Sequence, residues 1–168
     1  MILKRHRDIM FAEDEVNCCP ISIIITTLAA HAYNGEADVA DALLMILSNM
    51  ERFIERDQRN RAVIRNPSDP MENFADKWAE YPERERSFFA WLRQAREDFA
   101  KAAGMESPRL ITEALSPHIG VELAKRAEGR AGAGQGSLLR GATSVSAGAS
   151  APSFGSTARV PSKPEGFA

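Results

Sequence analysis

The sequence predicts an all-α fold, with a helical bundle of six or seven helices over residues 1–128 and a disordered tail over residues 129–168. Apolar residues recur at intervals of three and four through the first part, which is the spacing of one face of an α-helix. Eight of the 11 glycines lie from Gly129 onward, among alanine, serine and proline. A segment of that composition buries too little apolar surface to offset the entropy lost on ordering.

The first helix is expected at the very start of the chain, where Leu3, His6 and Met10 recur at helical spacing. Most domains open with a few loosely held residues. A helix that begins at the first residue therefore indicates that a further part of the protein precedes this chain.

A second helix is expected in the apolar run of residues 21–33. Isoleucine and threonine favour strands, so a buried strand is the alternative. The run is about twice the usual length of a strand, however, and Pro20 suits the first position of a helix. We therefore predict a central helix, apolar on every side, that begins at Pro20 and is broken by Asn34-Gly35.

A third helix is expected to carry one apolar stripe and to end in the charged stretch 55–61. The stripe comprises Leu43, Leu47, Met50 and Ile54. After it, Asp69-Pro70-Met71-Glu72 has the shape of a capping box with proline at the first helical position. This motif predicts a short helix whose Phe74 and Trp78 face the core.

Three more helices are expected before residue 129. The first ends at Gly104, a residue that commonly terminates helices. Its buried face comprises Phe88, Trp91, Leu92, Ala95 and Phe99. Ser107-Pro108 caps the next helix, and a last helical stretch is expected from Pro117 to about Glu128.

Composition excludes several classes of partner. The net charge is −2, and the segment from residue 129 carries four basic side chains and one acidic, so residues 1–128 carry −5. This acidic charge argues against a nucleic-acid partner, because binding to nucleic acid relies on basic surface. No stretch reaches the roughly 18 apolar residues of a membrane span, and no signal-peptide core follows the basic N-terminus. We expect a cytoplasmic protein without a membrane partner.

Cysteine and histidine are few in this sequence. Cys18 and Cys19 are the only cysteines, and two adjacent cysteines form neither a disulfide framework nor a zinc site. His6, His31 and His118 are scattered, with no carboxylate or cysteine at ligand spacing. We therefore expect buried cysteines, structural histidines and no metal site.

Two groups of residues carry a resemblance. The first is Leu3-Lys4-Arg5-His6-Arg7-Asp8 followed by residues 20–28; the second combines Asn66-Pro67, Asp69-Pro70, Glu72-Asn73-Phe74 and Lys77-Trp78. Together they resemble the C-terminal lobe of the bacterial cGAS/DncV-like nucleotidyltransferases (the CD-NTases), more distant relatives of which are the oligoadenylate synthases. The second group is the more specific, and the likeness covers roughly residues 2–128.

The resemblance implies two nucleotide-binding residues. In that family a lysine on the first helix and a serine at the start of the next hold the triphosphate, and the matching positions here are Lys4 and Ser22. In the first turn of a helix, free N–H groups and the positive end of the dipole favour an anion. An ammonium on a neighbouring helix adds a point charge for phosphate. The alternatives are a solvated surface lysine and a hydroxyl bonded to its own helix end.

The polar and aromatic residues of the second group have simpler expected roles. Asn66 and Asn73 are expected to bond backbone groups around the turn that begins at Asn66. Contact with another lobe or with nucleotide is the alternative for both. Trp78 and Trp91 are expected in the core.

The sequence lacks the pattern of aspartates that catalyses nucleotidyl transfer in this family. The family presents an Asp-x-Asp motif after a Gly-Ser turn, with a third aspartate on a nearby strand, and these hold two metal ions. Gly136-Ser137 and Gly155-Ser156 lead into no such motif, and Asp38 and Asp41 lie three apart on an expected helix. We predict no catalytic residue in this chain. Mg²⁺ would belong to the complete enzyme, whose N-terminal catalytic lobe is missing here.

The resemblance thus implies part of an enzyme that makes cyclic oligonucleotide second messengers from nucleoside triphosphates in antiphage defence. This chain would close the nucleotide cleft and bind the triphosphate. Alone it would be inactive. Its partners would be the missing lobe and nucleoside triphosphates such as ATP. A stand-alone helical interaction module without catalysis is the alternative.

The end of the chain carries a further implication of the resemblance. Some enzymes of the family end in a flexible arm whose terminal glycine or alanine is joined to a target amine by a ubiquitin-like ligation machinery. The chain ends in Gly166-Phe167-Ala168, so Ala168 is the candidate conjugation site. A small terminal residue lets the carboxylate enter a narrow adenylation channel. The alternative is a tail that only aids solubility.

Overall fold

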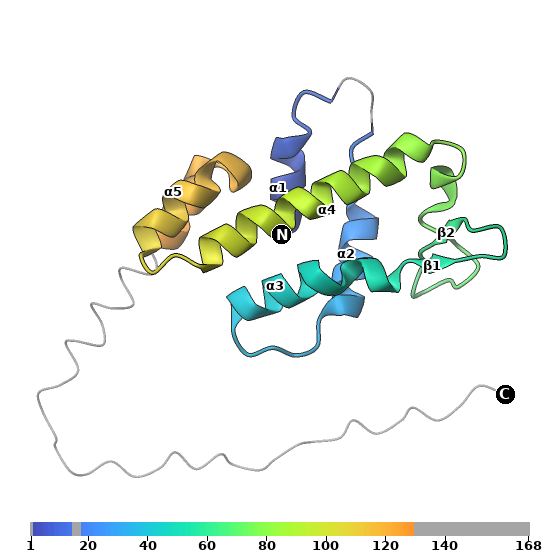
Figure 1. Ribbon diagram of the computed structural model, residues 1–168, viewed down its shortest axis with the longest axis horizontal. Coiled ribbons are helices and arrows are strands. Elements are labelled where there is room, and N and C mark those ends of the chain that lie inside the picture. The colour runs from blue at the N-terminus through green and yellow to red at the C-terminus, as the bar shows by residue number, and fades with distance from the viewer. Residues whose placement is uncertain (1, 15–17, 130–168) are drawn as a thin grey trace, which may run out of the picture.

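In the computed structural model, which describes residues 2–14 and 18–129, the chain is a bundle of helices (Figure 1). A helical stretch over residues 121–129 follows the five labelled α-helices. The labelled helices are α1 (Ile2–Met10), α2 (Ser22–Ala32), α3 (Val39–Asn49), α4 (Pro82–Ala103) and α5 (Pro108–Ile119). The predicted all-α class is confirmed. Residues 130–168, which hold nearly all of the predicted tail, lie outside the described part.

The long helix α4 crosses the middle of the bundle, and α1, α3 and α5 pack against it (Figure 1). Its buried side chains recur at intervals of three and four, as the sequence predicts. They are Phe88, Trp91, Leu92, Ala95, Phe99 and Ala102. Full burial of a large apolar side chain contributes about 1.5–3 kcal/mol, so this face of α4 contributes substantially to core stability.

The structure of α2 confirms the helix expected in the apolar run and excludes the alternative strand. Ile24 and Ile25 are each 1% exposed and belong to the core. Ile21 and Ile23 are 47% and 44% exposed, so part of this apolar run faces solvent and the helix is less central than predicted. The predicted start is also wrong. Ser22 is the first helical residue, and the carbonyl of Pro20 accepts a hydrogen bond from another helix instead.

The end of α3 differs from the prediction as well. The helix stops before the expected charged stretch, and a single 3-10 turn and a small antiparallel hairpin follow it. These elements are η1 (Met50–Phe53), β1 (Glu55–Arg56) and β2 (Ala62–Val63). Asp57 stabilises the hairpin turn, because its carboxylate accepts hydrogen bonds from the N–H groups of Arg59 and Arg61. Strands of two residues carry no alternation by which the sequence could indicate them.

The predicted capping box forms a turn and no helix, so that prediction is wrong. The carboxylate of Asp69 accepts the N–H of Met71, as a cap would. In a capping box the Glu72 carboxylate would accept a hydrogen bond from the N–H of Asp69. Here it accepts one from the side-chain amide of Asn66 instead. The chain becomes helical only at the 3-10 turn η2 (Asp76–Trp78).

Asn73 holds this turn against the hairpin. Its Oδ1 accepts hydrogen bonds from the N–H groups of Ile64 at 2.8 Å and Ala75 at 3.0 Å. Its Nδ2 donates to the carbonyl of Ala62 at 3.0 Å. The expected bonding of this asparagine to the backbone is therefore confirmed, as is the burial of Trp78 and Trp91, which are 5% and 0% exposed.

The bundle closes with α5 and residues 121–129. Pro117, predicted to begin the last helix, lies inside α5 instead. The break falls three residues later at Gly120, whose φ of 89° is favourable only for glycine. Helix α5 packs against both α1 and α4. No helix in the described ranges is long and apolar enough to cross a membrane.

Candidate functional site

The candidate site lies where α1 meets the start of α2. Ser22 is the first residue of α2, and the preceding residue, Ile21, makes no capping hydrogen bond with its side chain. The first N–H groups of a helix lack partners within the helix. With the positive end of the helix dipole, they make this corner suitable for an anion.

Arg7 links α1 to this corner. Its Nη1 donates to the Oγ of Ser22 at 2.7 Å and to the carbonyl of Pro20 at 2.9 Å. The guanidinium also pairs with the adjacent Asp8, and the Arg7 side chain is only 14% exposed. A guanidinium is therefore held directly against the serine that the resemblance implicates. Arg7 is a site residue that the sequence did not predict.

Lys4 lies one turn before Arg7 on α1, and residues three apart share a helix face. The Lys4 side chain is half-buried. Its ammonium has no hydrogen-bond or ion-pair partner among the described residues. The structure brings Ser22 together with Arg7, and no contact joins Ser22 to Lys4. The i, i+3 spacing of Lys4 and Arg7 is the signal that could have revealed the arginine.

The loop before α2 is held by an aspartate. The carboxylate of Asp14 accepts hydrogen bonds from the N–H groups of Cys18 and Cys19, both at 2.7 Å. The two thiols form no disulfide. Partial burial raises the pKa of the Cys19 thiol above its ordinary value, which outweighs the opposite effect of Arg7. Both cysteines are half-buried, so the expectation of full burial is wrong.

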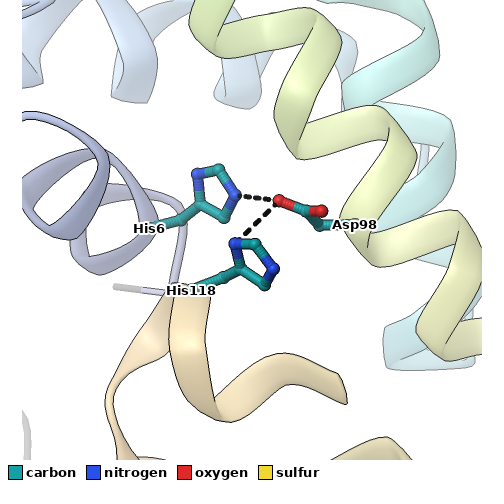
Figure 2. Close-up of side chains that lie close together, drawn as sticks. All are labelled: His6, Asp98 and His118. Atoms are coloured by element: carbon teal, nitrogen blue, oxygen red, sulfur yellow. Dashed lines mark hydrogen bonds and ion pairs between the residues drawn. The ribbon is translucent and has the colours of Figure 1, made fainter.

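Two of the histidines that look scattered in the sequence meet in the structure. His6 of α1 and His118 of α5 both contact the carboxylate of Asp98, on α4 (Figure 2). Burial lowers the pKa of His6 below its ordinary value, against the opposite effect of Asp98. The third histidine, His31, is exposed and stacks on Phe53 at a ring-centroid distance of 5.8 Å. The histidines were expected to lack a carboxylate partner, and the structure corrects this. Asp98 is too far from them in the sequence for ligand spacing to indicate the contact.

Catalytic Mg²⁺ does not fit the side chains present. Mg²⁺ prefers octahedral oxygen coordination, with carboxylates as its protein ligands. Within residues 2–14 and 18–129, the one group of three metal-binding side chains that converge is His6, Asp98 and His118. Two imidazoles and a single carboxylate do not provide the pair of carboxylates that a two-metal nucleotidyltransferase site requires. Asp38 caps α3 through the N–H groups of Ala40 and Asp41.

The chain is similar to a curated c-di-GMP synthase from Roseivirga ehrenbergii, with 32% identity over 118 residues, which are 68% of this chain. It is related to the bacterial cGAS/DncV-like nucleotidyltransferases. The chain spans 31% of the length of that synthase. No family model matches the chain.

The fold of these nucleotidyltransferases also matches in three dimensions. The chain superposes on a CD-NTase from Bradyrhizobium diazoefficiens, solved in complex with GTP, with a TM-score of 0.59 and 23% identity. The match covers 78% of this chain and 38% of that one. The helical bundle is therefore a fold that CD-NTases contain. Of the predicted site residues, Lys4 and Ser22 are described, and Ala168 lies outside the described ranges.

Proposed function

We propose that this chain is the C-terminal helical part of a nucleotidyltransferase that joins nucleoside triphosphates into cyclic oligonucleotides. Its relationship to a c-di-GMP synthase supports the class of reaction. Because the chain spans about a third of that relative, the catalytic carboxylates and their Mg²⁺ would belong to an N-terminal lobe. The described residues support this division of labour, since they do not bring together the carboxylates that such a metal site needs.

The role of this part is to hold the triphosphate. The observation that carries this assignment is the Arg7 guanidinium placed 2.7 Å from Ser22 Oγ at the start of α2. Phosphate oxygens there would accept hydrogen bonds from the first N–H groups of the helix and from the guanidinium. Lys4, which has no ion-pair partner among the described residues, would supply a second positive charge from the same face of α1.

A titration tests this assignment. Inorganic triphosphate, GTP and guanosine are each titrated into the full chain and followed by calorimetry. Triphosphate and GTP should bind, and guanosine should bind at least tenfold more weakly, because the proposed contacts are all to phosphate. Equal affinity for GTP and guanosine would contradict a triphosphate site. Failure of all three to bind would favour the alternative, an interaction module without a nucleotide.

The biological setting follows from the family. Antiphage signalling by a cyclic oligonucleotide is the proposed role of the complete cytoplasmic enzyme. Conjugation through Ala168 by a ubiquitin-like ligation machinery is a further proposal from the sequence. Co-expression with neighbouring ligase genes, followed by mass spectrometry, should reveal a conjugate that disappears when Ala168 is deleted. An intact terminus that forms no conjugate in the presence of those genes would contradict it.

A further inference from the structure

A cluster of ionisable side chains lies outside the proposed triphosphate site, between three helices (Figure 2). Nε2 of His6 lies 3.0 Å from Oδ2 of Asp98, and Nδ1 of His118 lies 3.1 Å from the same oxygen. The three candidate ligand atoms all fall within 4.8 Å of one another. The three residues are far apart in sequence, so their convergence is a product of the fold.

We infer that His6, Asp98 and His118 bind a divalent transition-metal ion of the Zn²⁺ type. Two imidazole nitrogens and one carboxylate oxygen are a ligand set that Zn²⁺ accepts, with a fourth position left for water. The set suits neither Mg²⁺ nor Ca²⁺, which take six or more ligands, mostly oxygen. The inference does not rest on the proposed nucleotidyltransferase function.

The spacing of the ligand atoms supports this. With Zn–N and Zn–O bonds of about 2.0–2.2 Å, two ligands of a tetrahedral ion stand about 3.3–3.5 Å apart. The two nitrogens lie 3.0 and 3.1 Å from the aspartate oxygen. An increase of a few tenths of an ångström in these two nitrogen–oxygen distances would bring them to the spacing of zinc ligands. Without the ion, Nε2 of His6 hydrogen-bonds to this oxygen and Nδ1 of His118 contacts it, and metal binding would release protons from the ligands.

Neighbouring residues hold the ligands in place. Nε2 of Gln94 donates to Oδ1 of Asp98 at 3.0 Å, which orients the carboxylate and leaves Oδ2 facing the histidines. The ring of His6 packs against Phe99 and Trp91, with centroid distances of 5.6 and 6.4 Å. Ligands fixed in this way lose little conformational entropy when an ion binds.

The cluster also has a route to solvent. The side chain of His6 is 1% exposed and that of Asp98 is 11% exposed, whereas that of His118 is 36% exposed. An ion would therefore enter beside His118 and bind deepest at His6. Once bound, it would tie α1 to α4 and α5. Because Lys4 and Arg7 flank His6 on α1, the ion would also stiffen the helix that carries them.

Zinc titration of the full chain, after removal of metals by a chelator, tests the inference. Calorimetry should give one Zn²⁺ per chain, and His118→Ala should weaken binding by at least tenfold. His118 is partly exposed, so its replacement leaves the core intact. The matched control is His31→Ala, which removes an exposed histidine away from the cluster and should leave the affinity unchanged. A Cys18→Ser, Cys19→Ser variant should also keep its affinity, which separates the cluster from thiol binding.

Thermal unfolding gives an independent readout. Zn²⁺ should raise the Tm of the parent chain and of His31→Ala, and should leave the Tm of His118→Ala unchanged, because an ion stabilises only the state that binds it. Mg²⁺ at the same concentration should have no such effect. The inference is overturned if the stripped parent chain binds no Zn²⁺, or if His118→Ala binds it as tightly as the parent.

Discussion

Arg7 shows how one side chain can join parts of a site that the sequence presents separately. It lies on α1, yet its guanidinium contacts Ser22 and the carbonyl before α2. The Ser22 hydroxyl thereby lies against a guanidinium that also pairs with Asp8. The nucleotide-binding role of Ser22 and Lys4 nevertheless stays a prediction.

Removal of either predicted residue should weaken triphosphate binding. Loss of one charge-assisted phosphate contact costs about 1.5–3 kcal/mol, which corresponds to about a ten- to hundredfold loss of affinity. GTP titration of Lys4→Ala and Ser22→Ala, in the enzyme completed with its catalytic lobe, measures this. Lys101→Ala is the control, because Lys101 is exposed on α4. Unchanged affinity in both variants would refute their role.

Asn73 should be important for stability and not for nucleotide affinity. Its side chain bonds three backbone groups, of Ala62, Ile64 and Ala75. Asn73→Ala leaves these partly buried groups without partners, and we expect a loss of about 1–3 kcal/mol in the free energy of unfolding. Urea unfolding of the variant measures the loss. The control is Ser68→Ala. Ser68 is exposed in the neighbouring turn, so this replacement should change stability by much less. A loss of GTP affinity in a stably folded Asn73→Ala would instead favour the alternative role in binding.

Among the elements, α3 has a defined cap. The carboxylate of Asp38 accepts hydrogen bonds from the N–H groups of Ala40 at 2.8 Å and Asp41 at 3.1 Å. Asp38→Ala should therefore lower the free energy of unfolding by about 0.5–2 kcal/mol. Asp38→Ser preserves a capping oxygen and should retain most of the stability. Equal stability of Asp38→Ala and the parent chain in urea unfolding would show that the cap contributes nothing.

The elements also show where periodicity was informative. The long face of α4, from Phe88 to Phe99, was predicted because its apolar residues keep a regular helical spacing over several turns. The start of α2 was predicted too early, at Pro20, and α3 ends at Asn49, well before the predicted stretch 55–61. Their ends depend on single contacts, such as that between Arg7 and Pro20, which no local pattern encodes. The short hairpin was not predicted for a related reason. It is held by hydrogen bonds that involve the side chains of Asp57 and Asn73, which no periodic pattern indicates.

At the scale of the whole molecule, the chain alone should be catalytically inactive. Incubation with the four nucleoside triphosphates and Mg²⁺ should give no cyclic product, because no three carboxylates converge among the described residues to hold two metal ions. Addition of the proposed N-terminal lobe should restore synthesis, detected by chromatography and mass spectrometry. Turnover by the repurified chain alone would show that its carboxylates have been misjudged.

The sequence by itself determined the helical class, the core face of α4, the buried tryptophans and the resemblance to CD-NTases. These features depend on local spacing and on short motifs, which a linear chain displays directly. The tertiary structure alone decided that His6 meets Asp98, 92 positions away, and that His118 joins them. It also decided that Arg7 lies against Ser22. Such meetings depend on how helices pack and turn relative to one another, and helical periodicity carries no record of those angles.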